Sequence, residues 1–178
     1  RSKKDQESGR DRIAEASADM DADIVRNVQG DEPFVNKSML ESLLNVFKGD
    51  DEKKIQVASP VKRITDPTHI ANPNIVKVAV DKNMNSMLFS RSVIPFQREE
   101  NAQVDYYEHV GVYAFRKEAL LQFTKWEMTP LEIAEKIECL RYIENGVQLR
   151  MVETTDNIIK IDVPEDLAKA EAYLKTQS

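Results

Sequence analysis

Strand-like and helix-like segments alternate along this chain, and this alternation constrains the fold more than any other feature of the sequence. Residues 23–28, 55–64, 75–80 and 147–152 are rich in β-branched residues, as strands are. Between them, residues 39–47 and 131–143 carry apolar side chains at helical spacing. The interleaving predicts an α/β fold in which helices flank a mixed, mostly parallel sheet.

The middle of the chain departs from this alternation. Residues 87–90 form a second strand-like stretch that follows 75–80 after a polar turn, which predicts a hairpin. Residues 97–106 are polar and are expected to form an exposed loop, and 109–115 alternate like another strand. We expect a single domain over residues 1–178, with a hairpin subdomain at 82–116 inside it.

The composition argues against several classes of partner. Acidic residues outnumber basic ones by 31 to 25, whereas proteins that bind nucleic acids or anionic membranes concentrate Lys and Arg. No apolar run is long enough to span a bilayer. We therefore expect no nucleic-acid partner and no membrane partner. The single cysteine, Cys139, cannot form an internal disulfide, which favours a reducing, cytoplasmic location.

Two aspartates occupy positions at which α/β sheets commonly bind ligands. Asp31 follows the first strand-like segment, directly after Gly30. Asp162 also follows strand-like residues and precedes Pro164, which is expected to open the last helix. Ligands collect at the carboxyl ends of strands in such sheets, where two carboxylates can share Mg²⁺ with substrate phosphates. Spacing alone favours a simpler interpretation of each Asp, as a turn former or helix cap.

The other polar residues indicate chemistry less specifically. His109 begins a strand-like segment, where a lone His is more often structural than a base. Arg91 ends one, where a surface ion pair is the simplest interpretation, and Tyr113 would pack in the sheet. The sequence contains no P-loop, no Cys/His zinc spacing and no Gly-x-Ser-x-Gly motif. Pattern alone therefore predicts an α/β domain without specifying its reaction.

A series of motifs, in a common order over nearly the whole chain, resembles the CMP-Kdo synthetases, or 3-deoxy-manno-octulosonate cytidylyltransferases. These motifs are VQGDEP at 28–33, NPNIVKV at 72–78, FSRSVIP at 89–95, HVGVY at 109–113, PLE at 130–132, LR at 140–141 and IDVPEDL at 161–167. The resemblance implies the Rossmann-like sheet of nucleotide-diphospho-sugar transferases. It also implies a homodimer, with residues 82–116 as the dimerisation subdomain.

The resemblance further implies a reaction and the residues that support it. The anomeric hydroxyl of Kdo, an acidic eight-carbon sugar, would attack the α-phosphate of CTP, giving CMP-Kdo and pyrophosphate for lipopolysaccharide synthesis. Asp31 and Asp162 would be the catalytic carboxylates and would hold Mg²⁺. The substrate-side and nucleotide-side residues carried over from the motifs are Gln29, Arg91, His109, Tyr113 and Glu138 for the sugar, and Ser8 and Gly9 for the nucleotide.

The sequence also departs from the family's pattern. No counterpart of the family's opening strand and basic triphosphate loop precedes Arg1, so we expect an N-terminally incomplete domain that, as written, does not turn over CTP. Cys139 stands where the family commonly has Gln, and Lys160 replaces a glycine close to Asp162. Two alternatives therefore stay open. One is a cytidylyltransferase for 8-amino-Kdo or another acidic sugar, such as a nonulosonic acid, and the other is a non-catalytic, oligomerising relative.

Overall fold

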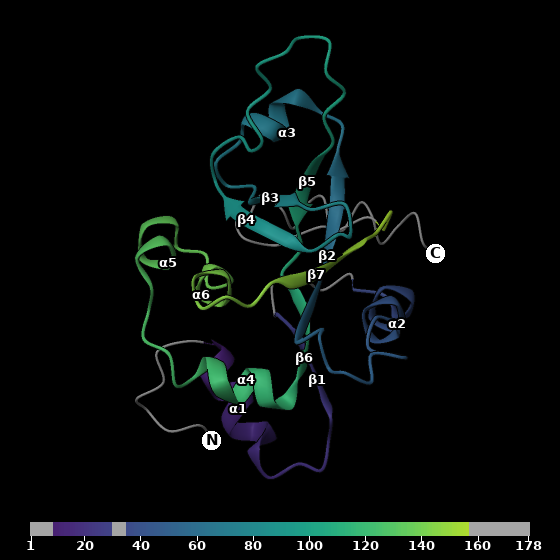
Figure 1. The fold of residues 1–178 in the computed structure, drawn as a ribbon, viewed down its shortest axis with the longest axis vertical. Helices are drawn as coiled ribbons and strands as arrows, with labels where there is room; N and C mark the ends of the chain where they lie inside the picture. The colour runs from purple at the N-terminus through teal and green to yellow at the C-terminus, as the bar shows by residue number, and fades with distance from the viewer. Residues whose placement is uncertain (1–8, 30–34, 157–178) are drawn as a thin grey trace, which may run out of the picture.

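The structure is a computed structural model that describes residues 9–29 and 35–156 (Figure 1). Asp31, Asp162, Ser8 and the helix predicted from Pro164 onward lie outside the described residues. The described elements follow one another in the order α1 (Gly9–Ala18), β1 (Ile24–Val28), α2 (Lys37–Asn45), β2 (Val57–Ile64), α3 (Pro67–Ala71), β3 (Lys77–Val80), β4 (Ser86–Ser90), β5 (Tyr106–His109), β6 (Val112–Arg116), α4 (Lys117–Phe123), α5 (Pro130–Glu135), α6 (Leu140–Glu144) and β7 (Leu149–Glu153).

The described strands form one mixed sheet, which confirms the predicted α/β fold. The strands lie in the order β1-β6-β2-β5-β3-β4, and β7 pairs with β2. Only the β2–β7 pairing is parallel among the described strands, and the other pairings are antiparallel. The expectation of a mostly parallel sheet is therefore corrected for this part of the chain. The short turn between β3 and β4 requires that pair to be antiparallel. β1, β2 and β7 do run in one direction, but β6 lies between β1 and β2 in the opposite direction.

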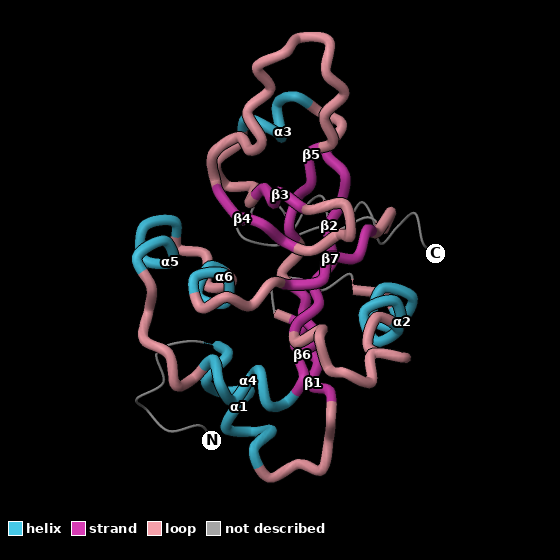
Figure 2. The backbone as a smooth tube through the Cα atoms, viewed as in Figure 1, coloured by secondary structure: helices cyan, strands magenta, loops and turns pink. Residues whose placement is uncertain are grey.

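The segment predicted as one strand at 109–115 is divided at residues 110–111. The backbone N–H of Val112 donates to the carbonyl of Val110 at 2.8 Å, so the chain makes a tight turn around Gly111. Before this turn, β5 lies between β2 and β3, and after it β6 lies between β2 and β1. Figure 2 shows β5 beside β3 and β4, and β6 beside β1, in different parts of the sheet. We call residues 109–113 the fork of the sheet.

The helix predicted over residues 131–143 is likewise divided, into α5 and α6. Lys136 follows α5 with φ 55° and ψ 45°, a left-handed conformation that ends the helix. The hairpin predicted between residues 75 and 90 is confirmed by the antiparallel pairing of β3 with β4. Among the described helices, none has both the length and the apolar character needed to cross a bilayer.

Helices cover both faces of the sheet. Neighbouring strand residues alternate between two apolar clusters, with Phe115 in one and Ala114 in the other. The larger cluster includes side chains of α4 and α6, such as Leu120 and Leu140, and the smaller one includes Leu43 of α2. The sheet is thus a middle layer between two apolar clusters that helices cover.

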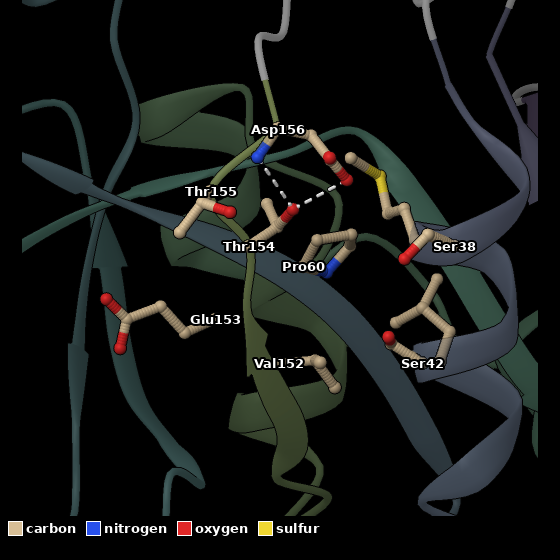
Figure 3. A pocket seen from close by; sticks show the side chains of 10 residues that line it. Ser38, Ser42, Pro60, Val152, Glu153, Thr154, Thr155 and Asp156 are labelled. Carbon is tan, nitrogen blue, oxygen red and sulfur yellow. Dashed lines mark hydrogen bonds between the residues drawn. The ribbon is translucent and has the colours of Figure 1, made fainter.

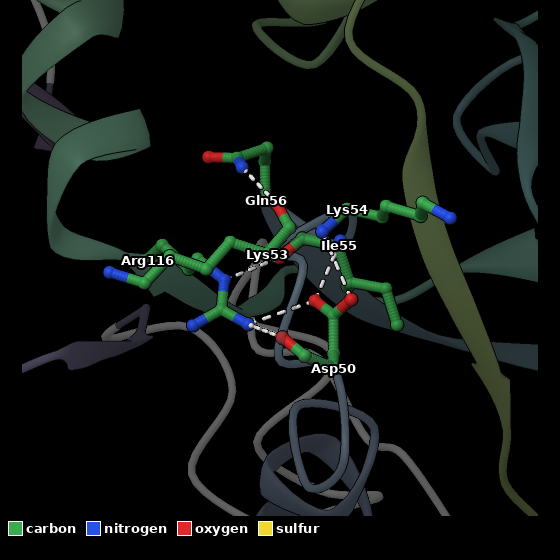
Figure 4. Close-up of polar contacts among 6 residues, drawn as sticks. All are labelled: Asp50, Lys53, Lys54, Ile55, Gln56 and Arg116. Atoms are coloured by element: carbon green, nitrogen blue, oxygen red, sulfur yellow. Dashed lines mark hydrogen bonds and ion pairs between the residues drawn. The ribbon is translucent and has the colours of Figure 1, made fainter.

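A buried ion pair holds the α2–β2 connection against the end of β6 (Figure 4). Arg116 Nη2 donates to the Asp50 carboxylate at 2.8 Å, and Arg116 Nε donates to the carbonyl of Ile55 at 3.0 Å. The Asp50 carboxylate also accepts the backbone N–H groups of Lys54 and Ile55, both at 2.9 Å. These contacts, led by the hydrogen bond from Arg116, hold the pKa of Asp50 below its ordinary value of 3.8.

We expect Asp50→Asn to destabilise the protein at neutral pH and to do so progressively less at acidic pH. Because the pKa of Asp50 is depressed in the folded state, its contribution is present above the ordinary value of 3.8 and is lost as the pH falls through the folded value. Urea unfolding at pH 7 and at about pH 3 would measure this difference. The exposed neighbour provides a control, because Asp51→Asn should leave the midpoint unchanged at both pH values. An Asp50→Asn cost that is equal at both would contradict the prediction.

Candidate active site

Two aromatic rings predicted for the sugar pocket meet at the fork of the sheet. His109 and Tyr113 are 6% and 3% exposed, and their ring centroids lie 5.5 Å apart. In a straight strand, positions four residues apart are separated by about 13 Å, so the turn around Gly111 is what brings these rings together. Phe89 of β4 packs edge-on against His109, with centroids 5.0 Å apart. The fork therefore forms a compact aromatic wall from three strands.

Ser59 of β2 completes the fork and was missed by the sequence reasoning. Its Oγ lies 3.0 Å from His109 Nε2, 2.9 Å from the Val112 carbonyl and 3.1 Å from the Val110 carbonyl. A hydroxyl has one proton, which goes either to one of these carbonyls, with Oγ accepting from His109 Nε2–H, or to an unprotonated Nε2; the direction is set by the His109 tautomer. Pro60 was the available signal, because a proline within a central strand marks a break in its ladder.

We expect Ser59→Ala to lower the free energy of unfolding by about 1–3 kcal/mol, because it removes the hydroxyl that bonds the buried His109 Nε2 and the carbonyls of Val110 and Val112. Ser59 is fully buried, so water cannot replace the hydroxyl without a rearrangement. Chemical denaturation measures the change, and Ser38→Ala, at an exposed position of α2, is the matched control. Equal unfolding midpoints for the two variants would show that the hydroxyl at the fork is dispensable.

Cys139 lies against the same two side chains. Its Sγ is 3.0 Å from Tyr113 Oη and 3.9 Å from His109 Nε2, and the residue is 1% exposed. The sequence pattern placed Cys139 among the apolar positions of one long helix, but the structure places it at the N-cap of α6. Glu138, the other predicted sugar-side residue here, is half-buried and precedes it directly. The link between α5 and α6 thus brings Cys139 to the fork, with Glu138 next to it in the chain.

Arg91 is anchored by backbone carbonyls rather than by a surface carboxylate. It follows β4, and its Nε donates to the carbonyl of Glu135 at 2.8 Å. Its Nη1 donates to the carbonyl of Pro73 at 3.1 Å. Within the described part of the chain, Nη2 has no hydrogen-bond partner. One edge of the guanidinium is therefore held by protein, while Nη2 and the second N–H of Nη1 remain available to an anion.

Lys77 lies beneath this arginine and is fully buried, with 0% exposure. Its Nζ donates to the carbonyls of Asn72 at 2.9 Å and Ile75 at 2.7 Å, and also to the carbonyl of Arg91. Burial lowers the pKa of Lys77, and the charge of Arg91 lowers it further. Alternation between Val76 and Val78 places Lys77 on the polar face of a strand, so its complete burial was not predictable from the local pattern.

Glu135, the last residue of α5, is the carboxylate in this group. Burial opposes its ionisation, but hydrogen bonds from the Ser90 hydroxyl at 2.6 Å and the Arg91 backbone N–H at 2.9 Å outweigh this effect and lower its pKa. Lys77, Arg91 and Glu135 therefore form two cations and one anion. Their net positive charge suits an anionic ligand.

The remaining predicted residues are placed less closely together. Gln29 is exposed and follows β1, whose Val28 is paired with Val112, so Gln29 lies beside the fork. Gly9 begins α1, whose main packing partner is α4. The structure thus brings Arg91, His109, Tyr113 and Glu138 into one region. α1, with Gly9 at its start, lies beside α4 (Figure 1).

The strands that lead toward the two predicted metal ligands run in the same direction. β1 and β2 are both antiparallel to β6, and β7 is parallel to β2. β1 and β7 therefore run toward the same end of the sheet. Neither aspartate is in the described ranges, and within those ranges no three His, Cys, Asp or Glu residues cluster as a metal site.

A polar cavity of about 190 Å³ opens beside the end of β7 (Figure 3). Ser38 and Ser42 line it from α2, and Thr154 and Asp156 line it from the segment after β7. Thr154 Oγ1 donates to the Asp156 carboxylate at 2.9 Å and accepts the Asp156 backbone N–H at 3.2 Å. These hydroxyl and carboxylate groups lie at the sheet edge toward which β1 and β7 both run.

Comparison with known proteins places the chain in a family. A model described as cytidylyltransferase matches residues 1–170. The 3-deoxy-manno-octulosonate cytidylyltransferase of Flavobacterium johnsoniae is 55% identical over 97% of this chain and 70% of its own length. The enzyme of the same name from Christiangramia forsetii is 51% identical over 98% of this chain and 70% of its own length.

Solved structures agree with this placement. A CMP:2-keto-3-deoxy-manno-octonic acid synthetase complexed with CTP superposes with a TM-score of 0.89 at 34% identity, covering 98% of this chain and 70% of that one. A 4-diphosphocytidyl-2C-methyl-D-erythritol synthase from Anaerococcus prevotii shares the fold, with a TM-score of 0.59 at 15% identity over 96% of this chain and 68% of that one. The chain therefore belongs to the 3-deoxy-manno-octulosonate cytidylyltransferase family.

Proposed function

We propose that this protein couples CTP to Kdo and releases pyrophosphate. The anomeric oxygen of the sugar forms a bond to the α-phosphorus, and the bond from that phosphorus to the bridging oxygen breaks. Pyrophosphate leaves with the electron pair, and the sugar hydroxyl loses its proton to solvent. The observation that carries the proposal is the anchored Arg91 guanidinium beside the fork, in a chain of this family, because an acidic sugar needs a cation at its carboxylate.

The fork would provide the wall of the sugar pocket. His109, Tyr113 and Ser59 are held to one another by contacts within the sheet, so they need little reorganisation when the sugar binds. Glu138 and Gln29, beside the fork, would bind sugar hydroxyls. These roles concern binding and orientation, since the reaction needs no protein nucleophile.

Asp31 and Asp162 would hold the Mg²⁺ that the family resemblance implies. The common direction of β1 and β7 supports this assignment, because both strands lead to the same sheet edge. Two carboxylates with substrate phosphates form a suitable oxygen donor set for Mg²⁺. When bound, the ion would supply charge stabilisation at the phosphates.

A pyrophosphate-release assay on the full-length protein tests the proposal. CTP and Kdo with Mg²⁺ should give release, and an excess of EDTA should abolish it until Mg²⁺ is restored. Parallel assays with 8-amino-Kdo and with a nonulosonic acid decide between the sugar alternatives. Release with one of these sugars but not with Kdo would identify a different substrate. No release with any of them would favour the non-catalytic relative.

We also propose that a second copy of the chain covers the β4 edge. β4 is at the end of the described strand order, which leaves backbone groups available for pairing. Met87 and Phe96, on and after this strand, are 57% and 82% exposed. Sedimentation should show a dimer that Phe96→Ser weakens, whereas Ile133→Ser, at an exposed apolar residue of α5, should not. A monomeric wild-type protein would contradict this arrangement.

A further inference from the structure

Four hydrogen bonds hold Arg91 in place. A residue that only had to lie near its ligand would not need so many. The Glu135 carboxylate accepts its backbone N–H, and the Glu135 carbonyl accepts its Nε. The Pro73 carbonyl accepts Nη1, and Lys77 Nζ donates to the carbonyl of Arg91. Both the backbone and the guanidinium of Arg91 are thus fixed, and the direction of its remaining N–H groups is set before any ligand arrives.

Lys77 connects this arginine to the loop that binds the guanidinium. Its three N–H groups are used by the carbonyls of Asn72, Ile75 and Arg91, so no donor is left for a ligand. The first two acceptors flank Pro73, whose own carbonyl accepts Arg91 Nη1. Lys77 therefore holds both partners of the Arg91–Pro73 contact, the backbone of Arg91 and the loop that carries Pro73. Burying an ammonium is costly, and here its hydrogen bonds organise backbone instead of forming an ion pair.

Glu135 also holds the backbone of Arg91 in place, through its carboxylate. The Ser90 hydroxyl and the Arg91 N–H bond its two carboxylate oxygens, at 2.6 Å and 2.9 Å. The Ser90 oxygen in turn accepts the backbone N–H of Ser92 at 3.0 Å, so the turn after β4 is closed around the carboxylate. Neither Lys77 nor Glu135 needs to touch a substrate to influence where Arg91 points.

We propose that Lys77 and Glu135 are positioning residues that pre-orient Arg91 toward the carboxylate of the acidic sugar, an inference that rests on the proposed function. A guanidinium binds a carboxylate best through two parallel N–H···O bonds. This geometry is lost by a rotation that leaves the charge almost in place. The structure assigns the two residues to holding that orientation, with little influence on CTP.

Steady-state kinetics of the full-length protein, with sugar and CTP varied separately, tests the assignment. Glu135→Ala and Lys77→Met should each raise the KM for the sugar roughly tenfold, with the KM for CTP and kcat within about twofold. Glu135→Gln keeps one oxygen acceptor, the amide carbonyl, in place of the two that accept from Ser90 and Arg91, and should be intermediate. Arg116→Met is the matched control, because that guanidinium also binds backbone carbonyls but contacts the α2–β2 connection. It should lower the thermal midpoint without selective effect on the sugar.

The carboxylate itself can be tested with the methyl ester of the sugar. Wild type and Glu135→Ala should bind the ester equally weakly, because the oriented guanidinium no longer faces an anion. An unchanged sugar KM in Glu135→Ala, or equal rises in both KM values, would overturn the positioning role. If Lys77→Met does not fold, the kinetics of Glu135→Ala alone decide whether the positioning role is correct. A wild-type protein that releases no pyrophosphate from CTP and any of the sugars would overturn the proposed function instead.

Discussion

Arg91→Met should raise the KM for the acidic sugar by about 100-fold, while the KM for CTP changes by less than about twofold. The reason is the loss of two charge-assisted hydrogen bonds, each of which contributes about 1.5–3 kcal/mol when made to a charged partner. A 100-fold effect corresponds to about 2.7 kcal/mol, which is close to the lower bound of about 3 kcal/mol for two such bonds. Methionine retains much of the side-chain volume, and packing should therefore change little.

Two further variants separate the geometry of Arg91 from its charge. Arg91→Lys keeps the charge but lacks the planar pair of donors, so it should restore only part of the affinity. Arg98→Met, in the exposed loop after β4, removes a cation of the same kind and should leave both KM values unchanged. Separate substrate titrations measure these effects. A sugar KM in Arg91→Met equal to that of Arg98→Met would exclude Arg91 from sugar binding.

The largest effect on stability is expected at Arg141. Its Nη2 and Nε donate to the two carboxylate oxygens of Glu132 at 2.6 Å and 2.7 Å, and the two side chains are 6% and 5% exposed. The guanidinium also lies 4.2 Å from the centroid of the Phe123 ring and donates to the Trp126 carbonyl. Removing the cation from a buried pair leaves an uncompensated charge, so Arg141→Met should cost about 3–5 kcal/mol.

Urea unfolding of Arg141→Met and of two comparison variants tests this expectation. The double variant Glu132→Leu/Arg141→Met removes both charges and should recover most of the loss. Lys37→Met breaks an exposed pair with Glu41, 3.5 Å apart, and should cost less than about 0.5 kcal/mol. If the double variant is as unstable as Arg141→Met, the loss comes from packing and not from the unpaired carboxylate.

The local sequence pattern was sufficient to predict those strands and helices that bury one face regularly. β-branched composition located β1, β2, β3 and β7, and helical spacing located α2, because these periodicities reflect which side faces the core. The motif order also singled out Arg91, His109, Tyr113 and Glu138, which the structure brings into one region. The roles of Asp31 and Asp162 stay predictions, since both lie outside the described residues.

Local pattern was not sufficient where distant segments impose the geometry. The turn at residues 110–111 separates β5, which pairs with β3, from β6, which pairs with β1. These pairings involve segments that are distant in the sequence. The left-handed Lys136 divides a stretch whose apolar spacing suits one helix. Ser59 has meaning only through His109, which is 50 positions away in the chain.

The residue types and their order thus specify an α/β chain of this family and name most of the side chains that would contact the sugar. Long-range pairing alone determines that these side chains surround a fork, and that Lys77 and Glu135 hold Arg91. The physical reason is that periodicity records the side of a strand or helix that is buried. A hydrogen bond between residues far apart in sequence depends on how the whole sheet is assembled.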